Sequence, residues 1–177
     1  MFFEERNYFL FLNLLKKYLL SYIDIYSYSL IPNHFHLFIR VRDGWESSET
    51  GINKTITNQF RKLFISYSTT LNKEYTLQGG FFLTPFKRRL ITNEFYFSQI
   101  IFYIHCNAIH HNLCAHPSEY LFSSYNSILS DKPSLLKRDE VLAWFGGKEA
   151  FIRGHELMES YYAEMPFFVN DGVPQKG

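Results

Sequence analysis

The chain has 177 residues, including 19 Phe and 13 Tyr, and a formal net charge of +1. This length suits one domain with a real core, or one domain with a short appendage. The small net charge argues against a generic polyanion-binding protein. Two cysteines, Cys106 and Cys114, fit free thiols in a reducing cytoplasm. The start has no signal-peptide pattern and no segment has the length and apolar character of a membrane span, so we expect a cytoplasmic protein without membrane contact.

The charge is distributed unevenly along the chain. Residues 51–91 carry seven Lys or Arg and one acid, Glu74, whereas residues 131–177 carry six basic and eight acidic residues. A basic middle and an acidic tail predict one cationic face. A solvated surface that happens to be basic explains the same pattern equally well.

The first part of the chain is expected to hold one helix and a pair of strands. Apolar residues at helical spacing, with acids in the first turn and lysines near the last, predict a helix over residues 4–20. Alternating β-branched and aromatic residues predict a strand over 21–30. Pro32-Asn33 is turn chemistry, and a second strand is expected over 34–42.

The remaining elements follow from the same rules. A helix is predicted over 52–70, a break at Gln78-Gly79-Gly80, and a third strand over 81–91. Asn93 is the predicted N-cap of a helix over 94–108. After a looser segment, two helices are expected over 138–145 and 148–163.

Two histidines stand one residue apart on the second predicted strand. Because side chains alternate along a strand, His34, His36 and Phe38 share one face. Imidazoles about 7 Å apart on one face can bind a single divalent metal. Two ordinary strand histidines explain this common spacing as well.

The helix predicted over 94–108 carries Tyr103 and Asn107, which are four residues apart and therefore on one helix face. An Asn carbonyl beside two imidazoles gives three ligands with open positions, which suits Mg²⁺ or Mn²⁺ together with substrate oxygens. A tyrosine one turn away can attack a metal-polarised phosphodiester and form a covalent phosphotyrosine. The alternative for Tyr103 is an aromatic residue of the core.

These stretches resemble a known family. Residues 31–39, Ile-Pro-Asn-His-Phe-His-Leu-Phe-Ile, are similar to the "MPNHVHLLI" signature of single-tyrosine HUH transposases (IS200-like). Residues 103–107 and 117–125 resemble the "YIHLNP…DPEDYPWSSY" block of the REP-associated tyrosine transposase branch. Residues 86–89, Phe-Lys-Arg-Arg, match the basic strand before that helix, and the similarity runs in order from about residue 2 to 163.

The resemblance implies an α+β fold, a ferredoxin-like antiparallel sheet with helices on one face and C-terminal helices. It implies His34, His36 and Asn107 as ligands of Mg²⁺ or Mn²⁺, and Tyr103 as the nucleophile on single-stranded or hairpin DNA. The expected reaction leaves a 5′-phosphotyrosine and a free 3′-OH, and rejoining needs no ATP. A homodimer and a monomer both occur in the family.

The same resemblance assigns a DNA surface and a domain division. The basic side chains expected on the DNA are Lys54, Arg61, Lys62, Lys87, Arg88 and Arg89. Residues 1–130 would form the catalytic domain, and residues 131–177 a helical extension packed on it.

Two features depart from the family pattern. Ala108 replaces the usual Pro, and His110-His111 stand where an Arg is usual. The family's first strand, expected in the middle of the sheet beside the histidine strand, is missing before the first helix. A truncated start explains this, as does a strand supplied by a partner chain or by residues 165–169.

Two other functions are compatible with the sequence. A non-catalytic relative would retain the fold and bind hairpin DNA or RNA, and Tyr103 would then be dispensable. A zinc protein would instead use the His/Cys cluster at residues 105–116.

Overall fold

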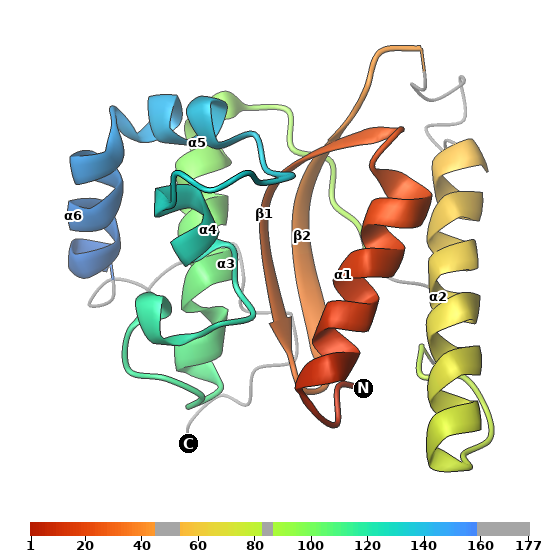
Figure 1. The fold of residues 1–177 in the computed structure, drawn as a ribbon. Helices are drawn as coiled ribbons and strands as arrows, with labels where there is room; N and C mark the ends of the chain where they lie inside the picture. Colours follow the sequence, from red (N-terminus) through yellow and green to blue (C-terminus); the bar gives the residue numbers. More distant parts are fainter. Residues whose placement is uncertain (45–53, 83–86, 159–177) are drawn as a thin grey trace. The chain divides into compact units, whose positions relative to one another are not determined.

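The computed structural model describes residues 1–44, 54–82 and 87–158, and Figure 1 shows their helices and strands. Strand β1 (Ile23–Ile31) pairs with β2 (His34–Val41) across the predicted turn, and these two strands form the sheet of the described chain. One helix precedes this hairpin along the chain and the others follow it, so the fold class is α+β, as predicted. The described part contains no helix with both the length and the apolar character needed to cross a membrane.

The chain divides into two compact units, and both take residues from the hairpin. Unit 1 comprises residues 1–25, 32–34 and 39–90. Unit 2 comprises residues 26–31, 35–38 and everything from 91 onward. Each strand therefore changes unit part-way along its length.

Unit 1 is built on two helices, α1 (Glu5–Leu19) and α2 (Lys54–Tyr75), which pack side by side. Asn7 fixes the start of α1, because its side-chain oxygen accepts hydrogen bonds from the backbone of Phe3 and Glu4. An aromatic core joins the helices, with Phe11 5.6 Å from Tyr67 between ring centroids. Both predicted helices are confirmed where the structure describes them.

Unit 1 also contains an ion pair across the hairpin. The carboxylate of Asp24 is 5% exposed, and it accepts bonds from Arg40 at 2.8 Å and Arg42 at 2.9 Å. Two guanidinium groups therefore balance one buried charge, which explains how an acid is tolerated inside a strand that is buried along nearly all its length.

Unit 2 surrounds helix α3 (Phe97–His110), which follows a 3₁₀ turn, η1 (Glu94–Tyr96). Asn93 caps this turn by accepting a bond from Phe95 N at 3.0 Å, as predicted. The later elements are η2 (Pro117–Glu119), α4 (Tyr125–Leu129), α5 (Arg138–Phe145) and α6 (Lys148–Met158). Helices α5 and α6 confirm the last two predictions up to residue 158, whereas α4 was not anticipated.

The predicted strand over 81–91 is wrong for the described residues, 81–82 and 87–91, which form no strand. Instead of alternating between two faces, Phe81 and Phe82 both lie against α2. Between ring centroids, Phe82 is 4.1 Å from Phe64 and Phe81 is 6.4 Å from Tyr67. Packing of adjacent aromatics on one surface is incompatible with the two-residue period of a strand. Residues 83–86 lie outside the described part.

Candidate functional site

Strand β2 places the two predicted histidines where the hairpin turn ends. His34 is its first residue, belongs to unit 1, and lies 3.0 Å from Asn33 between Nδ1 and the side-chain oxygen. His36 belongs to unit 2 and is half-buried. The strand and the turn before it are both as predicted, so the local sequence is sufficient to place this pair on one strand face.

Helix α3 carries the predicted tyrosine and asparagine in the interior of unit 2. Every residue from Ile100 to Ala108 is buried, which is the pattern of a helix packed on all sides. Tyr103 is 4% exposed and Asn107 is 1% exposed. The four-residue spacing places both on one face of the helix, as the sequence predicts.

Unit 2 brings one of the histidines against the tyrosine. The rings of His36 and Tyr103 are 5.2 Å apart between centroids and meet edge to face at 83°. This geometry is the favourable arrangement for two aromatic rings. The predicted histidine strand and the predicted tyrosine helix therefore meet within one unit.

The side-chain oxygen of Asn107 is a candidate metal ligand. Its Oδ1 atom is buried and accepts no hydrogen bond from the described residues. A buried carbonyl oxygen without a partner costs free energy unless something else donates to it or coordinates it. Asn107 lies one helical turn after Tyr103, the residue that His36 contacts. An amide oxygen and an imidazole nitrogen are both ligand types that Mn²⁺ accepts. Within the described part of the chain, no three His, Cys, Asp or Glu side chains gather into a metal site of their own.

The cluster proposed for zinc has a different arrangement. His105 is fully buried and uses both ring nitrogens: Nδ1 lies 2.9 Å from Nε2 of His155, and Nε2 lies 2.7 Å from Oγ of Ser124. Burial lowers the pKa of His105 well below its usual value, and the neighbouring His155 lowers it further. An imidazole bonded at both nitrogens is not a zinc ligand, so the zinc alternative loses a principal residue.

Three of the predicted DNA-binding residues lie on α2 in unit 1. Lys54, Arg61 and Lys62 are all exposed. Arg61 and Lys62 line a shallow hollow of about 280 Å³, together with Thr55, Asn58, Gln59 and Ile65. The helix therefore presents cations beside neutral hydrogen-bonding side chains, a combination suited to phosphate and sugar contacts.

Lys17 is a further cation of unit 1, and it was not among the predicted DNA contacts. The pKa of the Tyr18 phenol is lowered by its hydrogen bond with Ser66, and also by the charges of Lys17 and Lys62. Lys17 thus lies near the cationic side of α2. The sequence marked this residue only as a favourable charge at the end of α1.

The other predicted DNA-binding residues follow the undescribed residues 83–86. Lys87, Arg88 and Arg89 are exposed, and Arg88 Nη1 donates to Thr57 Oγ1 at 3.4 Å. This contact places part of the basic segment against α2.

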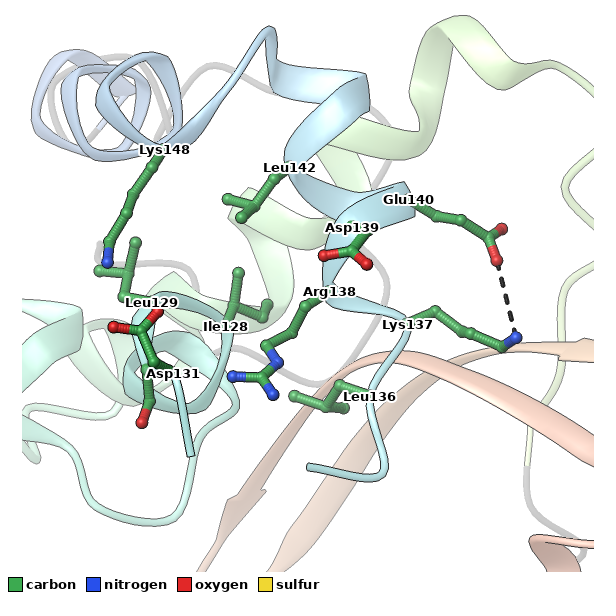
Figure 2. A pocket seen from close by; sticks show the side chains of 11 residues that line it. Ile128, Leu129, Asp131, Leu136, Lys137, Arg138, Asp139, Glu140, Leu142 and Lys148 are labelled. Carbon is green, nitrogen blue, oxygen red and sulfur yellow. Dashed lines mark ion pairs between the residues drawn. The ribbon is translucent and has the colours of Figure 1, made fainter. Parts of the chain in front are cut away.

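A cavity of about 590 Å³ lies elsewhere in unit 2, and Figure 2 shows the side chains around it. It is lined by Leu129, Leu136 and Leu142 together with charges of both signs, including Asp131 and Arg138. None of the sequence-predicted site residues lines it. The mixed charge shows no preference for a polyanion.

The chain was compared with protein-family models, with curated proteins and with solved structures, and none of these matches it.

Proposed function

We propose that this protein is a metal-dependent transesterase for single-stranded DNA at hairpins, with Tyr103 as the nucleophile. The observation that supports it is the contact between His36 and Tyr103, with Asn107 one helical turn further along α3. The resemblance to single-tyrosine HUH transposases rests on these residues. A histidine strand and a tyrosine helix distant in sequence meet within unit 2, as that function requires.

The proposed metal ligands are His36 and the side-chain oxygen of Asn107. The family resemblance also implies His34, which stands two residues before His36 on β2. When bound, Mg²⁺ or Mn²⁺ would supply Lewis-acid polarisation of the scissile phosphodiester.

Tyr103 provides the covalent step in this proposal. Its phenol oxygen forms a bond to phosphorus, the bond from phosphorus to the 3′ oxygen breaks, and the 3′ oxygen receives a proton. The phenol must lose its proton, because a tyrosine with an ordinary pKa of about 10 is protonated at neutral pH. The adduct conserves an ester bond, so attack by a 3′-OH can rejoin the strand without ATP.

The cationic side chains of unit 1 are the proposed DNA contacts, namely Lys54, Arg61, Lys62, Lys87, Arg88 and Arg89. Their exposure and the hollow on α2 support this assignment. We expect them to bind phosphates without reading the sequence.

The finer fold assignment belongs to the same proposal. The hairpin would be part of a ferredoxin-like sheet, and the family's first strand would lie beside the histidine strand. In the described chain β2 pairs with β1 alone. A segment preceding residue 1, a partner chain in a homodimer, or residues 165–169, which lie outside the described part, would supply the extra strand.

The burial of Tyr103 favours a second candidate function, a hairpin-binding protein without catalysis. Tyr103 is 4% exposed and belongs to the hydrophobic core of unit 2. A nucleophile must meet its phosphate, so catalysis requires this side chain to become accessible. In a pure binder it would simply fill the core.

Covalent capture distinguishes the two functions. The protein is incubated with Mn²⁺ and a pool of randomised single-stranded DNA hairpins, boiled in detergent, and the attached DNA is sequenced. The transesterase should yield an adduct that Tyr103→Phe abolishes and that Tyr96→Phe, a matched loss of a nearby phenol, leaves intact. Hairpins retained under native washing with no adduct would instead establish the binding protein.

A further inference from the structure

Three side chains form a continuous hydrogen-bonded chain through the interior of unit 2. His155 of α6 lies 2.8 Å from the backbone oxygen of Phe151 through Nδ1, and its Nε2 lies 2.9 Å from Nδ1 of His105. His105 Nε2 lies 2.7 Å from Oγ of Ser124. All three side chains are fully buried. The proposed reaction uses none of them directly.

The direction of every proton in this chain follows from one end. A backbone carbonyl only accepts, so His155 must carry its proton on Nδ1, and a neutral ring then accepts at Nε2. His105 must therefore donate from Nδ1 and accept at Nε2. The hydroxyl of Ser124 then donates to His105 at 2.7 Å, and not to its other acceptor, the backbone oxygen of Tyr28, which is farther away at 3.2 Å. These assignments are inferred from the hydrogen-bond geometry. Burial, which lowers the pKa of both imidazoles, is consistent with neutral rings.

The serine end of the chain is anchored to strand β1. Ser124 Oγ accepts a hydrogen bond from the backbone nitrogen of Tyr28 at 2.9 Å, and Ser124 N donates to the backbone oxygen of Tyr28 at 2.9 Å. Neighbouring Ser123 forms an antiparallel bridge with Ser29. The hydroxyl that holds His105 is thus fixed to the neighbour of the histidine strand.

The other end is anchored by very close helix packing. At Gly154, a Cβ atom would lie 2.6 Å from Cζ of Phe102 on α3. Only a glycine allows this approach without a shift of the ring. The ring of Phe102 also contacts His155, at 4.4 Å between centroids.

We infer that His105 is a positioning residue for the site, held by Ser124 and His155 so that α3 presents Tyr103 to His36 in one orientation. This inference rests on the proposed function. His105 lies between Tyr103 and Asn107 on the helix. One of its ring nitrogens bonds to Ser124, which is itself bonded to β1, and the other bonds to His155 on α6. Rotation or sliding of α3 would break a fully buried hydrogen bond, so the chain fixes the helix about its axis.

The variants for the test are made at His155, which is remote in sequence from the proposed ligands and nucleophile. His155→Gln retains an acceptor oxygen near the position of Nε2, whereas His155→Leu has a similar size and no acceptor. Ser124→Ala breaks the chain at its other end and serves if the leucine variant fails to fold. Thermal unfolding of each variant measures how much the substitution lowers the stability of the fold.

Nuclear magnetic resonance tests the positioning without any substrate. In the wild type, ¹⁵N-labelled histidine should show protons on Nδ1 of both His105 and His155. Ring protons of Tyr103 and His36 should show a cross-relaxation contact that His155→Gln retains and that His155→Leu or Ser124→Ala weakens. An Nε2 proton on either histidine, or an unchanged ring contact in the leucine and alanine variants, would overturn the inference.

The rate of DNA adduct formation with Mn²⁺ tests the consequence for chemistry. We expect the leucine or alanine variant to form adduct at least ~10-fold more slowly at saturating hairpin DNA, with unchanged hairpin affinity, and the glutamine variant to recover most of the rate. Equal rates in all folded variants would overturn a role in positioning. A wild type that forms no adduct, with the ring contact behaving as expected, would refute the proposed function and leave the positioning intact.

Discussion

Asn107 shows how a single buried atom can point to a ligand. Its amide oxygen is buried without a hydrogen-bond donor among the described residues, although nearly all such atoms in folded proteins have one. On a helix buried on every side, an unpartnered acceptor is a cost that a bound cation would remove.

We predict that Asn107→Asp makes the protein less stable without metal and more strongly stabilised by Mn²⁺. A buried carboxylate without a counter-charge is destabilising, whereas beside a divalent cation it is a better ligand than an amide. Thermal unfolding with EDTA and with Mn²⁺ measures both effects. Asn58→Asp, on an exposed position of α2, should shift neither. A metal-induced shift no larger than that of the wild type would count against Asn107 as a ligand.

The residues of the candidate site were predictable because each belongs to a local pattern. The turn at Pro32-Asn33 and the alternation after it predict the face that His34 and His36 share, and helical spacing relates Tyr103 to Asn107. The contact between His36 and Tyr103, which are 67 positions apart, was expected from the family resemblance alone. Nothing in the sequence marks the partners of His105, because these bonds join residues 19 and 50 positions away.

At the scale of elements, helix α3 is the centre of unit 2 and α6 packs directly on it. The apolar sequence of α3 predicted a helix, but the close approach of Gly154 to Phe102 depends on two elements meeting. A glycine within a helix otherwise costs up to about 1 kcal/mol relative to alanine. Its position here is explained by packing.

We predict that Gly154→Ala destabilises the protein by about 1–3 kcal/mol, despite the better helix propensity of alanine. The new methyl group would lie 2.6 Å from the Phe102 ring, which must move within a filled core. Urea unfolding provides the measurement. Gly80→Ala, where the added Cβ meets nothing closer than 4.0 Å, should change stability far less. A stabilised Gly154→Ala variant would show that α6 does not pack on α3 in this way.

The incorrect strand over 81–91 has an equally physical origin. The aromatic and β-branched residues of this segment favour a strand, but a strand also needs a neighbouring strand with which to exchange hydrogen bonds. Phe81 and Phe82 instead pack on aromatic residues of α2 and on Phe3, which precedes α1. The strand propensity of a segment does not show whether it will pair with another strand or pack on a helix.

At the scale of the whole molecule, the uneven charge predicts a specific salt response. We predict that Lys62→Gln lowers the affinity for hairpin DNA and reduces the slope of log affinity against log salt by about 1, the effect of losing one phosphate contact. Filter binding across a salt series measures the slope. Lys132→Gln, an exposed lysine in the acidic C-terminal part, should leave it unchanged. Equal slopes for both variants would place the DNA elsewhere.

The two buried imidazoles predict how stability depends on pH. Burial lowers the pKa of His155 to about 4 and that of His105 well below its usual value. Between pH 4 and 6.5 the unfolded chain therefore binds more protons than the folded protein. The free energy of unfolding should be fully maintained above pH 6.5 and fall as the pH drops toward 4, by about 3 kcal/mol from His155 alone.

Urea unfolding at pH 7 and pH 5 measures this loss, and His155→Gln provides the control. The variant lacks one of the two titrating groups, so its stability should fall less between the two pH values. Parallel losses in the variant and the wild type would mean that His155 does not titrate differently in the folded protein.

The most direct test of the account is to locate the covalent bond itself. DNA captured with Mn²⁺ is trimmed by nuclease, the protein is digested, and fragmentation of the peptides identifies the residue that carries the nucleotide and the end through which it is attached. The account predicts a 5′-phosphate on Tyr103. A nucleotide on any other residue, attachment through a 3′-phosphate, or no adduct on any hairpin that the protein binds would contradict it.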